Sequence, residues 1–126
     1  MNENFSESQL RGEIVFLQLK TDQNVLPGKE LLLCPECGFY YIHPTCVKVA
    51  TGKKVVSVDA ERTTITRAPT PETIKAVNRR GARIYLEYSC ENGHHGYIIL
   101  QFRKGNTFVE HEKLPHASDK ETLWRD

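Results

Sequence analysis

Two short cysteine-containing segments constrain this chain more than any other feature of its sequence. The first is CPECG at residues 34–38, and the second is CENGHH at residues 90–95. A Cys-x2-Cys or Cys-x3-His spacing lets one tight turn present two ligands to a single tetrahedral metal ion. Each segment contains a glycine, which accepts backbone conformations that a β-carbon resists. We call these segments the first and second knuckle, and together they predict one four-ligand site.

The predicted ligands of one Zn2+ ion per chain are Cys34, Cys37, Cys90 and His94. His94 is chosen because it directly follows the turn glycine, whereas His95 would begin the outgoing strand and point to the opposite side. His43 and Cys46 follow the first knuckle and offer an alternative pair of ligands. Thiolates at this spacing also hold iron, so the choice between zinc and iron stays open.

With these two knuckles the sequence resembles the zinc-ribbon class of proteins, in which knuckles on antiparallel hairpins clamp a zinc ion. The resemblance covers residues 31–43 and 84–103, and its most specific part is the CPECG segment. The second knuckle departs from that class by ending in histidine instead of cysteine. The resemblance implies a structural metal ion and contact with DNA, RNA or the polymerases that handle them.

Strand patterns dominate the chain between its two ends. Residues 83–88 alternate as in a half-buried strand, with Ile84, Leu86 and Tyr88 on one face and Arg83 and Glu87 on the other.

Further alternation over residues 98–102 and a turn at 104–106 predict an antiparallel meander in the C-terminal half. Residues 47–58 predict a hairpin, in which we expect Gly52 to adopt a positive φ. The predicted fold class is mainly β, an antiparallel sheet or meander with a zinc-ribbon-like site.

At most one short helix is predicted, over residues 70–80. Thr70 is suited to the N-cap, Pro71 to the first helical position, and Gly81 to the end. Only Ile74 and Val77 form an apolar stripe, so the same stretch also fits a loop.

The length of 126 residues predicts a single domain over residues 11–112 with a basic insertion at about 47–83. We expect a flexible N-terminus at 1–10 and a polar tail at 113–126. No secretory pattern begins the sequence and no apolar run is long enough to span a membrane, so a cytoplasmic location without a membrane partner is expected. In the cytosol the cysteines are expected to be thiols or metal ligands.

The formal net charge of +1 hides an uneven distribution of charged residues. Residues 47–83 hold nine basic and three acidic side chains, whereas both flanking regions are net acidic. Such a concentration of cations attracts phosphate and predicts contact with DNA or RNA, or with a complex that handles it. The candidate nucleic-acid contacts are Lys53, Lys54, Arg62, Arg67, Arg79, Arg80 and Arg83.

Catalysis is not predicted for this chain. Three cysteines and a histidine fill a tetrahedral site, whereas a catalytic zinc keeps one position open. A thiol enzyme built on Cys46 and His43 lacks a third group that orients the base. Nothing in the sequence supports a metal-dependent nuclease. We therefore predict a non-catalytic zinc protein that contacts nucleic acid; the alternative is a zinc-stabilised protein-interaction or self-assembling module that uses an exposed sheet edge.

Overall fold

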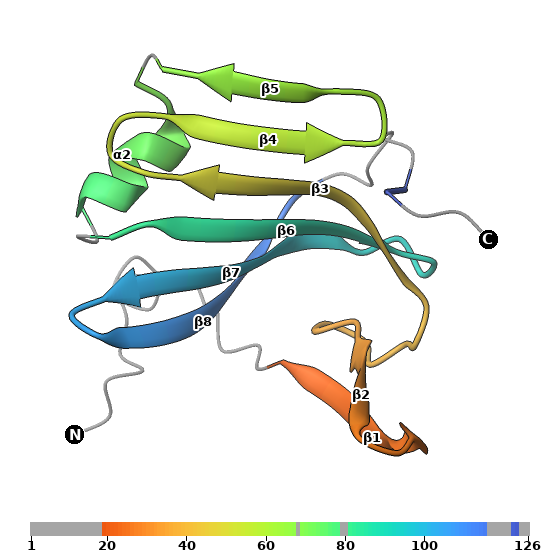
Figure 1. The fold of residues 1–126 in the computed structure, drawn as a ribbon. Coiled ribbons are helices and arrows are strands. Elements are labelled where there is room, and N and C mark those ends of the chain that lie inside the picture. The colour runs from red at the N-terminus through yellow and green to blue at the C-terminus, as the bar shows by residue number, and fades with distance from the viewer. Residues whose placement is uncertain (1–18, 68, 79–80, 116–121, 124–126) are drawn as a thin grey trace.

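The computed structural model describes residues 19–67, 69–78, 81–115 and 122–123. Figure 1 shows a two-stranded sheet beside a six-stranded sheet, with one short helix against the larger sheet. The elements are β1 (Lys20–Leu26), β2 (Lys29–Leu33), β3 (Ile42–Ala50), β4 (Val55–Asp59), β5 (Thr63–Thr66), α2 (Pro71–Asn78), β6 (Arg83–Cys90), β7 (His95–Arg103) and β8 (Asn106–Lys113). The prediction of a mainly β fold is confirmed.

The six-stranded sheet has the strand order β5-β4-β3-β6-β7-β8, and all neighbouring strands are antiparallel. Strands β6, β7 and β8 form the predicted meander, and β3 and β4 form the predicted hairpin. The basic segment 47–83 contributes the last four of the nine residues of β3, all of β4, β5 and α2, and the first residue of β6. No helix in the described part of the chain is long and apolar enough to cross a membrane.

Helix α2 begins as the sequence predicts. The Thr73 backbone N–H donates to Oγ1 of Thr70 at 3.2 Å, and the Thr70 N–H donates to Oγ1 of Thr73 at 2.8 Å. This reciprocal capping satisfies two N–H groups that a helix start leaves without partners. Pro71 is the first helical residue, where its missing N–H costs nothing.

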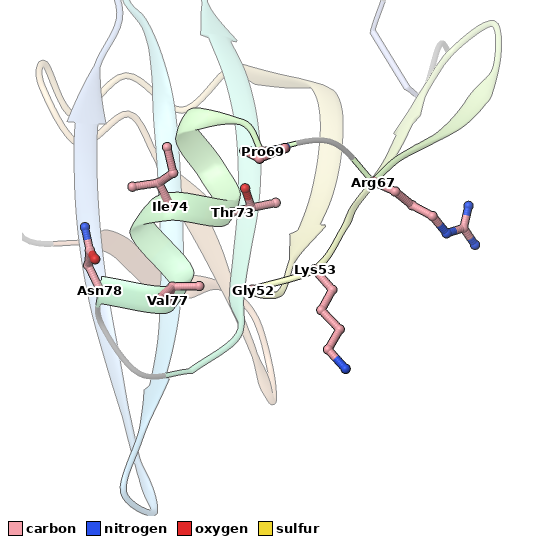
Figure 2. Close-up of a pocket in the computed structure, with 8 residues that line it drawn as sticks. All are labelled: Gly52, Lys53, Arg67, Pro69, Thr73, Ile74, Val77 and Asn78. Carbon is pink, nitrogen blue, oxygen red and sulfur yellow. The ribbon is translucent and has the colours of Figure 1, made fainter.

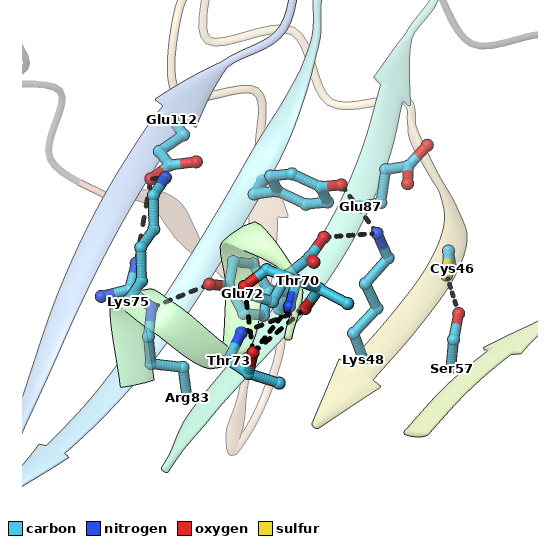
Figure 3. Close-up of polar contacts among 12 residues, drawn as sticks. Cys46, Lys48, Ser57, Thr70, Glu72, Thr73, Lys75, Arg83, Glu87 and Glu112 are labelled. Carbon is cyan, nitrogen blue, oxygen red and sulfur yellow. Dashed lines mark hydrogen bonds and ion pairs between the residues drawn. The ribbon is translucent and has the colours of Figure 1, made fainter. Parts of the chain in front are cut away.

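One face of the six-stranded sheet lies under α2, and we call it the helix face. Its apolar core joins Ala76 of the helix to Ala50, Val55, Tyr85 and Ile99 of four strands. Around this small core lies a network of polar side chains (Figure 3). Lys48 donates to Glu72 at 3.2 Å and to Tyr97 at 3.0 Å, which connects the sheet to the first turn of the helix.

The prediction of a half-buried strand over residues 83–88 is wrong for the face that carries Arg83 and Glu87. The alternation itself is correct, but both residues are buried on the helix face. Arg83 donates to Gln101 at 2.7 Å and to Glu110 at 3.2 Å, and these partners make its burial tolerable. Helix α2 covers the face of β6 that carries these two residues.

The opposite face is mostly apolar, with the buried His111 as a polar exception, and we call it the knuckle face because both knuckles pack at one end of it. Tyr88, Cys90 and Ile98 are buried there together with Cys34, and Leu32 and Phe39 pack against them. The hairpin β1–β2 thus reaches the larger sheet through the first knuckle.

In the turn between β3 and β4, a second prediction from the sequence is wrong. Gly52 does not have the expected positive φ. A β-carbon at this position would instead lie 2.8 Å from Cγ2 of Val77 in α2. Glycine is therefore needed for the close approach of turn and helix.

Candidate metal centre and basic groove

The first knuckle is a tight turn that joins β2 to β3. The Gly38 N–H donates to the Cys34 carbonyl at 2.8 Å, and the Cys34 N–H donates to the Phe39 carbonyl at 2.9 Å. Gly38 has a φ of 77°, which a residue with a β-carbon adopts only at a cost. The turn directs the sulfurs of Cys34 and Cys37 to the same side.

The second knuckle is the turn of the β6–β7 hairpin. The Cys90 N–H donates to the His94 carbonyl at 2.7 Å, and the Gly93 N–H donates to the Cys90 carbonyl at 2.9 Å. Gly93 has a φ of 91°, so glycine is again required at the corner. This hairpin places Cys90 and His94 opposite the first knuckle.

The four predicted ligands come together as one cluster. Their donor atoms all lie within 4.8 Å of one another, so the cluster could hold a metal ion. The Cys37 and Cys90 sulfurs are 3.6 Å apart, and the Cys34 sulfur is 3.8 Å from Nδ1 of His94. Two sulfurs bound to one tetrahedral zinc at about 2.3 Å are separated by roughly 3.8 Å, so the observed spacing fits a metal of that size.

Hydrogen bonds differentiate the thiols in this cluster. Burial opposes ionisation of Cys37, but hydrogen bonds from the Asn92 side chain and the Phe39 backbone outweigh it and lower the Cys37 pKa to about 6. Burial raises the pKa of Cys90 to about 11, and the neighbouring sulfurs add to that rise. A bound cation would compensate the charge of three clustered thiolates.

Asn92 was not singled out from the sequence. Its side-chain amide donates to the Cys37 sulfur at 3.5 Å, and its backbone N–H donates to the Cys90 sulfur at 3.4 Å. Hydrogen bonds of this kind orient thiolate ligands around a metal. The position of Asn92 between Cys90 and Gly93, inside the turn, was the sequence feature that could have identified it.

The three alternative ligands lie outside the cluster. His95 begins β7 and bonds to Glu87 at 3.0 Å on the helix face, as its predicted orientation requires. His43 contacts Glu91 of the second knuckle at 2.9 Å. Cys46 is buried on the helix face, with its sulfur 3.1 Å from the Ser57 hydroxyl (Figure 3).

The structure places the predicted nucleic-acid contacts in different parts of the molecule. Lys53 and Lys54 are exposed in the β3–β4 turn, and Arg67 is exposed just after β5, at the same end of the sheet. Arg62 lies in the β4–β5 turn at the opposite end. Arg83 is buried, and Arg79 and Arg80 fall outside the described residues.

A groove of about 560 Å³ lies between the β3–β4 turn, the end of β5 and α2 (Figure 2). Its lining residues are Gly52, Lys53, Arg67, Pro69, Thr73, Ile74, Val77 and Asn78. Two of these residues are cationic and none is acidic. The exposed Ile74 and Val77 add apolar surface beside the two cations. We call this feature the basic groove.

Comparison with known proteins adds no family to these observations. No protein-family model matches the chain, and no curated protein and no solved structure is significantly similar to it. The functional argument therefore rests on the candidate metal cluster and the surfaces around it.

Proposed function

We propose that the protein is a non-catalytic, zinc-ribbon-like protein that binds one structural Zn2+ ion and contacts nucleic acid through its basic groove. Three thiolates and one imidazole form a common structural zinc set. The same four donors complete a tetrahedron, which leaves no position for a catalytic water. The four cysteines form no disulfide, in keeping with the cytoplasmic location that is part of this proposal.

The structural role follows from what the cluster connects. Cys34 and Cys37 come from the connection after the small sheet, whereas Cys90 and His94 come from the turn of the β6–β7 hairpin in the large sheet. A metal ion held by all four would fix the β1–β2 hairpin to the knuckle face. The apparent free energy of such binding is on the order of 10 kcal/mol and becomes folding free energy.

The observation that carries the nucleic-acid proposal is a groove with two cations and no acid. Lys48, Lys75 and Arg83 are engaged in ion pairs with Glu72, Glu112 and Glu110. Lys53 and Arg67 are instead exposed residues that line the groove (Figure 2), and Lys54, next to Lys53 in the β3–β4 turn, is also exposed, so phosphates can reach all three. We leave the buried Arg83 out of the proposed surface.

Binding of a fluorescently labelled single-stranded oligonucleotide, followed by anisotropy at several salt concentrations, tests this proposal. Three phosphate contacts predict a slope of log K against log salt of about −2, which is a roughly 20-fold weakening between 50 and 200 mM salt. Arg67→Ala should reduce the slope by about 0.7.

Arg62→Ala is the matched control, because it removes the same charge from an exposed turn at the opposite end of the sheet. It should leave the slope unchanged. Absence of binding at low salt, or equal effects of the two substitutions, would contradict nucleic-acid contact at the groove without affecting the proposed metal site.

A further inference from the structure

The knuckle face carries a continuous row of aliphatic side chains across all six strands. The register of the sheet aligns the members of this row, which are Ile65, Val56, Val49, Ile84, Leu100 and Val109. Each strand contributes one residue, and none of the six is polar. We call this feature the aliphatic row.

The two ends of the knuckle face differ in how well they are covered. Ile98, which lies under the knuckles, is 7% exposed, whereas Val49, Val109 and Ile65 in the aliphatic row are 39%, 49% and 52% exposed. Phe102, two residues beyond Leu100 on the same face, is also exposed. The metal centre therefore covers one end of this face and leaves the other open to solvent.

The size of this open patch follows from sheet geometry. Six strands about 4.8 Å apart span roughly 25 Å, and two steps of about 6.6 Å between same-face residues span roughly 15 Å. The patch therefore covers on the order of 400 Å². Contiguous apolar patches of a few hundred Å² on soluble proteins often mark interaction sites.

We propose that the aliphatic row is the contact surface for a second copy of this chain. A two-fold axis brings each patch onto the same patch of its partner, so any charge in it would meet its own copy. The row contains no charge and so avoids that repulsion. Two twisted sheets can then pack face to face about 10 Å apart and bury both rows.

The patch area sets the expected strength of the dimer. Stable interfaces bury about 800 Å² on each partner, and this patch offers roughly half of that. We therefore expect a reversible dimer with a Kd on the order of 10–100 µM. Because the contact is apolar, raising the salt concentration should not weaken the dimer, whereas it should weaken nucleic-acid binding at the basic groove.

Sedimentation equilibrium of the full-length, metal-loaded protein over a concentration series tests the proposal. Val49→Glu and Val109→Glu each place a charge in the interface and should weaken the dimer at least about tenfold. Both side chains are exposed in the monomer, so far-UV circular dichroism and metal content should not change. Val25→Glu is the matched control, because Val25 is also an exposed valine, in β1 outside the large sheet.

Wild type and Val25→Glu should dimerise alike with rising concentration. A wild-type protein that stays monomeric at roughly 500 µM, well above the expected Kd, overturns the proposal. A dimer as strong in Val49→Glu and Val109→Glu as in Val25→Glu also overturns it and would move the contact elsewhere, for example to the exposed edge of β5.

Discussion

The helix face and the knuckle face of the six-stranded sheet differ in a way that side-chain polarity alone does not explain. The helix face carries Arg83, Glu87 and Gln101, yet all three are buried. The knuckle face carries Val49 and Ile65 in its aliphatic row, yet both are exposed. Burial in this sheet depends on what covers each face, and polar residues are tolerated under a cover where partners satisfy them.

Among the substitutions that test this comparison, Arg83→Met is expected to lower the free energy of unfolding most. The substitution removes a buried cation and leaves Gln101 and Glu110 without their partner. We expect a loss of about 3 kcal/mol in the free energy of unfolding, measured by urea denaturation.

Arg103→Met is the control for this prediction, because Arg103 is an exposed arginine at the end of β7. Its effect should stay within about 0.5 kcal/mol. Equal losses from the two substitutions would show that the helix face does not depend on its buried polar network.

A smaller effect is expected where the β3–β4 turn meets α2. Gly52→Ala puts a β-carbon 2.8 Å from Cγ2 of Val77, whose branched side chain has little freedom in a helix. We expect a destabilisation of about 1 kcal/mol by urea denaturation.

Repeating Gly52→Ala in a Val77→Ala variant tests this reason, because Val77→Ala removes the methyl groups that conflict with the new β-carbon. Val77 is exposed. In that background Gly52→Ala should be neutral or slightly stabilising, since Gly52 needs no positive φ. An unchanged penalty would mean that the contact with Val77 is not the reason for glycine.

The smallest effect is expected from Glu72→Gln, which breaks the ion pair with Lys48 under the helix. Burial favours the neutral form of Glu72, but its backbone hydrogen bond and Lys48 outweigh burial and lower its pKa. A lowered pKa in the folded state stabilises the fold above the unfolded pKa of about 4.3, and this stabilisation is lost as pH falls through the folded pKa.

Glu72→Gln should therefore cost about 0.5–1 kcal/mol at pH 7, and the cost should shrink as pH falls below about 4.3 and through the lowered folded pKa of Glu72. Urea denaturation of both proteins across this pH range measures it. If the difference in unfolding free energy between the two proteins stays constant with pH, the ion pair of Glu72 with Lys48 is not the cause of that difference.

The cluster of four candidate metal ligands was predictable from the sequence because each pair of ligands is encoded locally. Each knuckle sets the spacing of two ligands within one turn, and the strand after Gly93 fixes which of His94 and His95 faces inward. The strand alternation and the Thr70 cap were visible for the same reason.

Long-range packing was not visible in the sequence. The burial of Arg83 depends on a helix that covers it and on Glu110, 27 residues away. The exposed aliphatic row depends on the register of six strands, and the role of Gly52 depends on its contact with Val77. No pattern within one segment encodes these contacts.

The central claim is that one metal ion links the two knuckles, and the metal content of the purified protein tests it most directly. Native mass spectrometry should find one zinc ion per chain in the wild type, in His95→Gln and in Cys46→Ser. His94→Gln should lose the ion together with thermal stability. A wild-type chain that folds without metal, or equal metal loss in His95→Gln and His94→Gln, would contradict the account.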